Sequence, residues 1–227
     1  MAPPVPAPPL VPLAAGSSGF SSGVTLGTLE GGGGRRGSGV GAKWAKGMPV
    51  RAGAVAPAQR RVLLLGESGS GKTALLLRLG EFAQRGTVGL SDLSDIIPTV
   101  GVEVSEFQFH KTPILVREVG GQMAALWSEY YAGCDMVLYA VDLGNRPQIC
   151  SVMVRLMGLL QAKGLEGKRL LVLLNKADCP RPMNRAEVDF SSGLGLLEAS
   201  NERVASVTVS ATEGVGLEEV LEHIRKG

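Results

Sequence analysis

A glycine-rich string in the chain has the residue types that bind phosphate. Residues 66–73 read GESGSGKT and directly follow the apolar run Val62–Leu65. A G-x-x-x-x-G-K-[ST] pattern between a buried strand and a helix brings main-chain N–H groups and a helix N-terminus around an anion. The ammonium of Lys72 would reach the terminal phosphates, and the hydroxyl of Thr73 would ligate Mg²⁺. We therefore expect a phosphate loop made of Gly66, Glu67, Ser68, Gly69, Ser70, Gly71, Lys72 and Thr73.

A second motif, farther along the chain, has the residue types that recognise guanine. Residues 175–178 read NKAD and follow the apolar run Leu170–Leu174. The carboxylate of Asp178 can accept hydrogen bonds from both N1–H and the 2-amino group of guanine. Adenine offers neither donor, so a site of this kind can discriminate by about 10⁴ or more. The stem of Lys176 would pack on the base, and Asn175 would tie this loop to the phosphate loop.

The loop after the last apolar run completes the expected base site. It contains Ser210, Ala211 and Thr212, and the main-chain N–H of Ala211 can meet the guanine O6. By chance the phosphate-loop string occurs in roughly one chain in thirty of this length, and NKxD in roughly one in a hundred. Because both occur here, in this order and each after an apolar run, we expect the ligand to be GTP or GDP.

Two loops between these motifs have the residues that would respond to the terminal phosphate. In PTVG, the hydroxyl or carbonyl of Thr99 can ligate Mg²⁺. In EVGGQ, the carboxylate of Glu118 can hold a magnesium-bound water, and the N–H of Gly121 can sense the γ-phosphate. Gln122 can orient an attacking water, and with Lys72 it forms the expected catalytic pair. Alone, PTVG or EVGGQ could be an ordinary turn. Their position between the phosphate loop and NKAD favours a role in nucleotide binding.

Composition divides the chain into two parts. Residues 1–58 are rich in Pro, Gly and Ser, which cannot bury enough apolar surface to fold, so we expect a disordered tail. A transit peptide, or translation from Met48, are alternatives that the sequence leaves open. Of the 227 residues, the remaining 59–227 suffice for one α/β domain, and 44% hydrophobic residues support a core.

Charge and cysteine content exclude several classes of protein. Residues 1–60 contain six Lys/Arg and one acid, a net charge of +5, whereas the remainder has 17 basic and 20 acidic residues, a net charge of −3. The globular part is therefore not expected to bind nucleic acid. The three cysteines lack C-x-x-C spacing, which indicates free thiols in a reducing compartment. No apolar stretch reaches the length of a transmembrane span.

Strand-like and helix-like segments alternate from Arg61 onward. A gap of only three residues, His110–Thr112, separates two of the strands, so these should pair antiparallel, and the others should form a parallel sheet covered on both faces. Strands are expected at 61–66, 102–109, 113–119, 135–142, 169–175 and 204–210, and helices at 72–85, 122–132, 147–163, 184–198 and 217–226.

Taken together, these motifs resemble the small GTPases of the Ras superfamily, and within it the Arf/Arf-like branch. The features typical of the branch are PTVG, the double glycine of EVGGQ and the W-x-x-Y-Y string at Trp127–Tyr131. The resemblance covers 61–227 and implies a Ras-like G domain: a P-loop NTPase fold with a six-stranded, mostly parallel sheet, one antiparallel strand and about five helices. It implies GTP/GDP and Mg²⁺ as cofactors.

The sequence departs from this family's pattern at three places. Glu118 stands where the family has Asp, which puts the magnesium geometry in question, and Ser68 can crowd an arginine supplied by a partner. Arf proteins are myristoylated on a glycine that follows the initiator Met, whereas Ala2 and Pro3 stand here. We therefore expect no N-myristoylation, and a monomeric, cytoplasmic protein whose route to membranes would be its partners.

The sequence thus predicts a molecular switch that binds GTP or GDP with Mg²⁺, hydrolyses GTP slowly and controls the binding of effectors. Exchange and activating proteins would be further partners. A GTP-binding interaction module with negligible hydrolysis is the alternative that Glu118 and Ser68 motivate. A third possibility, an ATP-dependent P-loop kinase, is disfavoured by NKAD and by the lack of an Arg-rich lid.

Overall fold

The computed structural model describes residues 58–89, 92–94 and 96–227. Apart from Ala58, the predicted tail 1–58 lies outside the described residues. The strands are β1 Arg60–Gly66, β2 Val102–Phe109, β3 Thr112–Val119, β4 Met136–Asp142, β5 Arg169–Asn175 and β6 Val204–Thr208. The α-helices are α1 Lys72–Arg85, α2 Arg146–Gln161, α3 Arg185–Ser192, α4 Leu194–Ser200 and α5 Leu217–Lys226, with two 3₁₀ segments, η1 Gly121–Tyr130 and η2 Lys163–Leu165.

The strands form one six-stranded sheet in the order β2-β3-β1-β4-β5-β6. All neighbouring pairs are parallel except β2 and β3, which are antiparallel. His110 and Lys111, with φ of 46° and 69°, form the turn that joins this pair. Two residues in this conformation match the twist of a hairpin. The predicted mostly parallel sheet with one antiparallel edge strand is confirmed.

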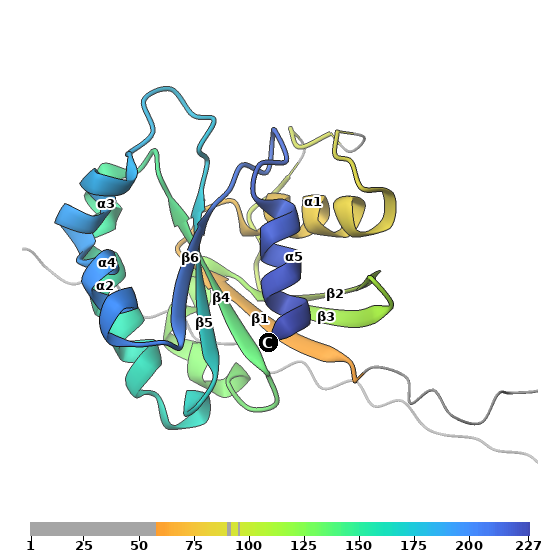
Figure 1. The fold of residues 1–227 in the computed structure, drawn as a ribbon, viewed down its shortest axis with the longest axis horizontal. Coiled ribbons are helices and arrows are strands. Elements are labelled where there is room, and N and C mark those ends of the chain that lie inside the picture. The colour runs from red at the N-terminus through yellow and green to blue at the C-terminus, as the bar shows by residue number, and fades with distance from the viewer. Residues whose placement is uncertain (1–57, 90–91, 95) are drawn as a thin grey trace, which may run out of the picture. The chain divides into compact units, whose positions relative to one another are not determined.

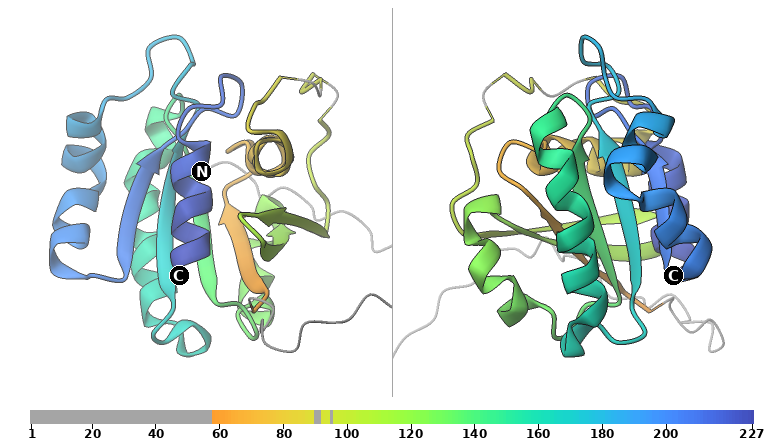
Figure 2. Two further views of the ribbon diagram at one scale, coloured as in Figure 1. Left: turned by 45° about the vertical axis from the view of Figure 1, so that its right-hand side comes forward. Right: turned by 90° about the vertical axis from the view of Figure 1, so that its left-hand side faces the viewer.

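Helices cover both faces of the sheet, with α1 and α5 on one side and α2, α3 and α4 on the other (Figures 1 and 2). Along β1, Val62 and Leu64 pack in the cluster of buried side chains that includes α1 and α5. Leu63 and Leu65 pack in the opposite cluster, with α2, α3 and α4. Because both faces of β1 are buried, the strand is apolar at each of the four positions Val62–Leu65.

Two predicted helices differ from the structure. The predicted helix 122–132 is the 3₁₀ segment η1, which is interrupted by non-helical backbone at Met123. The predicted helix 184–198 is broken at Gly193, whose φ of 67° ends α3 and precedes α4. A glycine adopts this left-handed conformation without a steric penalty, which explains why the chain turns there. Within the described ranges, no helix combines the length and apolar character needed to cross a membrane.

Candidate nucleotide site

A hollow of about 240 Å³ lies at the carboxyl ends of β1 and β3. In an open α/β sheet this edge is where ligands bind. Nine of the predicted site residues line the hollow, and they come from four segments that are distant in sequence: Ser68, Gly69, Gly71, Lys72, Thr73, Thr99, Glu118, Gly121 and Lys176. The chain also contributes Ala74, Leu93, Ile96, Ile97 and Pro98.

The phosphate-loop end of the hollow is built to receive negative charge. The Nζ of Lys72 lies 3.0 Å from the carbonyl oxygens of both Gly66 and Glu67 and donates to them. Burial lowers the pKa of Lys72, and the nearby Glu118 and Glu67 carboxylates oppose that shift. No side chain caps the N-terminus of α1, and no acidic residue lies in its first turn. The first N–H groups of α1 are therefore available to an anion.

Three side chains meet beside Lys72 with their oxygen atoms converging. The Thr73 hydroxyl donates to Glu118 Oε1 over 2.7 Å and lies 3.0 Å from the Thr99 hydroxyl, which is 3.3 Å from the same Oε1. Glu118 is only 1% exposed, and its Oε2 has no hydrogen-bond partner among the described residues. Burial raises the pKa of Glu118, although the Thr73 hydrogen bond and the charge of Lys72 counteract it. Hydroxyl and carboxylate oxygens with one unsatisfied atom suit a hard cation such as Mg²⁺.

Asn175 links the NKAD loop to the phosphate loop. Its side-chain amide is buried and donates to the carbonyl of Ser70 over 2.8 Å. Gly71 lies so close to this amide that a Cβ there would sit 2.4 Å from Asn175 Nδ2, and its φ is 83°. The two loops are therefore in direct contact, and glycine is required at position 71.

Asp178 points its carboxylate to the neighbouring loop after β6. The Ser210 hydroxyl donates to Asp178 Oδ1 over 2.6 Å. This hydrogen bond is the main cause of a lowered pKa at Asp178, and Thr212 adds to it. Asp178 is exposed at the edge of the sheet. Ala211 is buried beside it, and its carbonyl accepts from Arg78 Nε over 3.1 Å.

Lys176 lies between these two ends of the site. It has a φ of 65°, and its ammonium forms an ion pair with Asp142 Oδ2 at 2.7 Å. Asp142, at the end of β4, also accepts from the N–H of Gly144. The ion pair thus holds the ammonium of Lys176, and the residue is part of the lining of the hollow.

The double glycine of EVGGQ packs tightly between two loops. A Cβ on Gly121 would lie 2.2 Å from the main-chain N of Ser68, and one on Gly120 would lie 2.4 Å from the carbonyl oxygen of Thr99. Gly120 also donates its N–H to the carbonyl of Gly101 over 2.9 Å. The pair is therefore in close contact with both the phosphate loop and the Thr99 loop.

Not every predicted residue faces the hollow. Gln122 is exposed at the start of η1 and is not part of the lining. The side chain of Glu67 points instead to α2, where Arg155 Nε lies 3.0 Å from Glu67 Oε1. Asn175, Asp178 and the loop Ser210–Thr212 are not part of the lining either; Asn175 bonds to Ser70 of the phosphate loop, and Asp178 bonds to Ser210.

Two arginines that the sequence motifs do not identify support the site. Arg155 pairs with Glu67 and places its guanidinium 5.9 Å from the centre of the Trp127 ring. Arg78 is 5% exposed and holds the loop after β6 through Ala211. Neither belongs to a short motif; for Arg78 the only signal is a charged residue on a helix face that is otherwise apolar.

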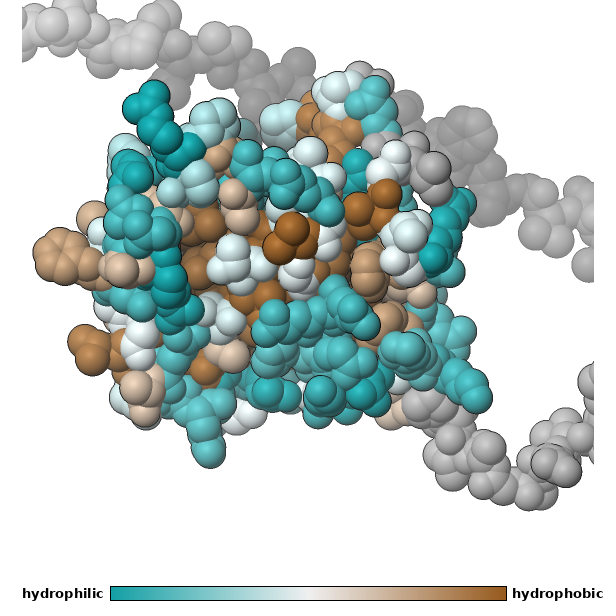
Figure 3. All heavy atoms as spheres, turned by 45° about the horizontal axis from the view of Figure 1, so that its top comes forward, coloured by the Kyte–Doolittle hydropathy of each residue, from teal (hydrophilic) through white to brown (hydrophobic). Residues whose placement is uncertain are grey.

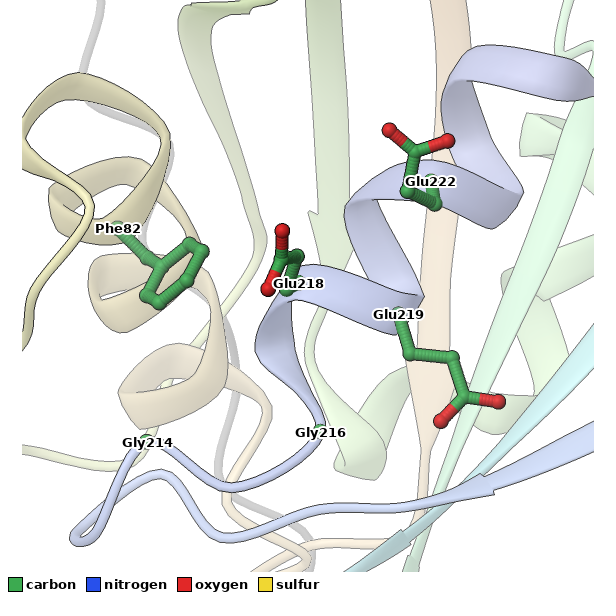
Figure 4. A pocket seen from close by; sticks show the side chains of 6 residues that line it. All are labelled: Phe82, Gly214, Gly216, Glu218, Glu219 and Glu222. Atoms are coloured by element: carbon green, nitrogen blue, oxygen red, sulfur yellow. The ribbon is translucent and has the colours of Figure 1, made fainter.

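A second, larger hollow of about 530 Å³ lies elsewhere, between the end of α1 and the start of α5. Figure 4 shows the ring of Phe82 from α1 facing Glu218 at the start of α5. Its charged lining residues are Glu218, Glu219 and Glu222, and Glu222 already pairs with Arg225 and Lys226. Carboxylates at the first turn of a helix stabilise that turn, so this hollow needs no ligand to explain it.

The chain is similar in sequence to a known protein family. The ADP-ribosylation factor family model matches residues 52–227. The human ADP-ribosylation factor-like protein 16 is 35% identical over 161 residues, which cover 70% of this chain and 81% of that protein. The ADP-ribosylation factor-like protein 1 of Drosophila melanogaster is 32% identical over 166 residues, or 72% of this chain and 86% of that protein.

Among solved structures, the fold is similar to that of the Arl6 BBS3 small GTPase of Trypanosoma brucei, which was solved with the nucleotide analogue GppNp. The TM-score is 0.63 at 21% identity, covering 74% of this chain and 96% of that one. The identity is too low to carry more than the fold, but the family model and the curated relatives span most of the chain. The predicted family is confirmed: this chain belongs to the ADP-ribosylation factor family of small GTPases.

Proposed function

We propose that this chain is a molecular switch that binds GTP or GDP with Mg²⁺ and hydrolyses GTP slowly. The observation that carries the proposal is the physical link between a phosphate site and a guanine site. Asn175 donates to Ser70 within the phosphate loop, and three residues later Asp178 is held by Ser210. A ligand that fills both ends must combine polyphosphate with a base that presents two adjacent donors.

Each end of the ligand would be recognised by a different type of interaction. The main-chain amides of Ser68–Thr73 and the ammonium of Lys72 would bind the phosphates. Asp178 would accept from guanine, Lys176 would cover the base, and Ala211 would donate its N–H to O6. Thr73, Thr99 and Glu118 would hold Mg²⁺, which when bound would neutralise charge on the terminal phosphates.

The switch would use the loops that meet at the double glycine. Because Gly121 touches the phosphate loop and Gly120 touches the carbonyl of Thr99, a third phosphate would act on both loops at once. Exposed apolar side chains lie on or beside these loops: Ile97 is 81% exposed, Val100 86% and Leu126 49%. Figure 3, which brings this edge of the sheet forward, shows apolar residues among polar ones. Effector proteins that bind here would sense the nucleotide.

Hydrolysis would be slow because Gln122 must move before it can orient water. It is exposed and lies outside the lining of the hollow. We therefore expect turnover on the order of 10⁻³ s⁻¹ or slower without an activating protein. The same observation supports the second candidate function, an interaction module that binds GTP and scarcely hydrolyses it.

Single-turnover hydrolysis of GTP separates the two candidates. The switch predicts a slow but measurable rate that falls further in Gln122→Leu and stays unchanged in Gln161→Leu, a matched control at the exposed end of α2. Equal rates in Gln122→Leu and the native protein would remove the catalytic role of Gln122. In that case, retention of GTP through purification would favour the interaction module.

A further inference from the structure

The positions of Thr73, Thr99 and Glu118 indicate how Mg²⁺ would be coordinated. This inference rests on the proposed function, because the metal would bind together with a nucleotide. The three oxygens Thr73 Oγ1, Thr99 Oγ1 and Glu118 Oε1 are separated by 3.0, 2.7 and 3.3 Å. Adjacent ligands in a Mg²⁺ octahedron with bonds of about 2.1 Å lie about 3.0 Å apart. The triangle therefore has the size of one octahedral face.

The backbone of Glu118 cannot withdraw to make room for an intervening water. Glu118 lies on β3, an inner strand, where it is paired with Leu64 of β1 on one side and Glu103 of β2 on the other. An aspartate at this position would be shorter by one C–C bond, about 1.5 Å, and would end farther from the two hydroxyls. The extra methylene of glutamate instead brings the carboxylate into contact with Thr73.

The burial of the carboxylate favours direct contact with a cation. Glu118 is 1% exposed, and its Oε2 has no hydrogen-bond partner among the residues that the structure describes. The oxygen near the two hydroxyls is Oε1, and a divalent cation bound directly to it would lower the cost of burying the negative charge of the whole carboxylate. The Thr73 and Thr99 hydroxyls already lie 2.7 and 3.3 Å from Oε1.

We propose that Glu118 ligates Mg²⁺ directly, in the place of the water through which an aspartate would act. Oxygens of Thr73, Thr99 and Glu118 then coordinate the metal in a nucleotide complex in which Thr99 keeps the position that it has here. The bound metal keeps one water fewer than it would with aspartate at position 118.

Counting metal-bound water tests this. Full-length protein is loaded with GDP or a non-hydrolysable GTP analogue and with Mn²⁺ in place of Mg²⁺, and the Mn²⁺ resonance is recorded in ¹⁷O-enriched water. The native protein is compared with Glu118→Asp, which keeps the charge. We expect one additional bound water in the variant. Equal hydration in the two proteins would overturn the proposal.

A measurement on the native protein alone covers the case in which the variant does not fold. Glutamate labelled with ¹³C at the side-chain carboxyl should give a strong hyperfine coupling to Mn²⁺ when a carboxylate oxygen is bonded to the metal. Absence of that coupling overturns the direct bond. Nucleotide binding is measured first, with and without EDTA: failure to bind guanosine nucleotides contradicts the proposed function, whereas bound nucleotide with equal hydration contradicts only the direct ligation.

Discussion

Glu67 in the phosphate loop and Arg155 on α2 form an ion pair with a separation of 3.0 Å. The same guanidinium lies 5.9 Å from the centre of the buried Trp127 ring in η1. The carbonyl of Glu67 in turn accepts from Lys72 Nζ. Arg155 thus connects the loop that would bind phosphate with the segment that follows Gly121.

Replacing Arg155 with alanine should loosen both segments. The pair is partly exposed, so we expect a loss of stability of at most about 1 kcal/mol and GDP release faster by about threefold, or ~0.6 kcal/mol. Trp127 emission should change, measured in a Trp44→Phe background because the chain has two tryptophans. Arg146→Ala is the control: Arg146 lies on α2, as Arg155 does, and forms an exposed pair with Glu187 of α3, so its loss should leave GDP release and emission unchanged. Identical behaviour of the two variants would contradict the link.

Substituting Gly121 by alanine should disturb the phosphate loop. The added Cβ would meet the main chain of Ser68 at 2.2 Å, so one of the two segments must move. We expect the affinity for GDP and GTP to fall by at least about tenfold, or ~1.4 kcal/mol. Gly158→Ala is the matched control, since that glycine lies in α2 with open space around it. The control should gain up to about 1 kcal/mol of stability and bind nucleotide normally; unchanged affinity in Gly121→Ala would refute the contact.

Removal of the Asn175 side chain should separate the two binding loops. The buried carbonyl of Ser70 would lose its donor, at a cost of about 1–3 kcal/mol, and titration calorimetry should show weaker binding of GTP and GDP alike. Asn184→Ala is the comparison, because Asn184 caps α3 and its loss costs a similar amount, about 1 kcal/mol. If both variants lose the same affinity, the effect of Asn175 is one of general stability.

The Ser210 hydroxyl should set the pH at which Asp178 titrates. Its hydrogen bond lowers the pKa of Asp178, so the associated stability is complete above the ordinary pKa of an aspartate and is lost as the pH falls through the lowered value. In Ser210→Ala the titration of the Asp178 carboxyl, followed by ¹³C NMR, should move to higher pH. Ser206→Ala, whose hydroxyl binds Arg185 instead, should not move it. An unshifted titration in Ser210→Ala would exclude this cause.

The sequence predicts the sheet well because β1, β4 and β5 contain unbroken apolar runs that end in a motif or a polar residue. The short connection between β2 and β3 predicts that they pair antiparallel, and the helices between the other strands predict a parallel sheet, whereas the order of the strands comes from the structure. The break between α3 and α4 at Gly193 cannot be predicted in this way, because a single glycine in a helix-like pattern does not reveal the sign of its φ. The 3₁₀ form of η1 and its non-helical backbone at Met123 are equally hidden, since the sequence pattern there is also typical of an α-helix.

Some residues of the candidate site can likewise be predicted from the sequence, and others cannot. Short motifs identify the loops because phosphate and guanine recognition require particular residues within a few positions of one another. Arg155, 88 residues from Glu67, becomes visible only when the fold brings α2 to the phosphate loop. The position of Gln122 outside the hollow also depends on the conformation of η1, which no motif specifies.

Titration calorimetry of the full chain with GDP, GTP and ATP in Mg²⁺ tests the central claim most directly. The native protein should bind both guanosine nucleotides with a dissociation constant of about 1 μM or tighter and ATP at least about 100-fold more weakly. Asp178→Ala should lose that preference, whereas Asp135→Ala, which removes a pair with Arg61 at the amino end of β4, should keep it. No heat with either guanosine nucleotide, or equal binding of ATP by the native protein, would contradict the account.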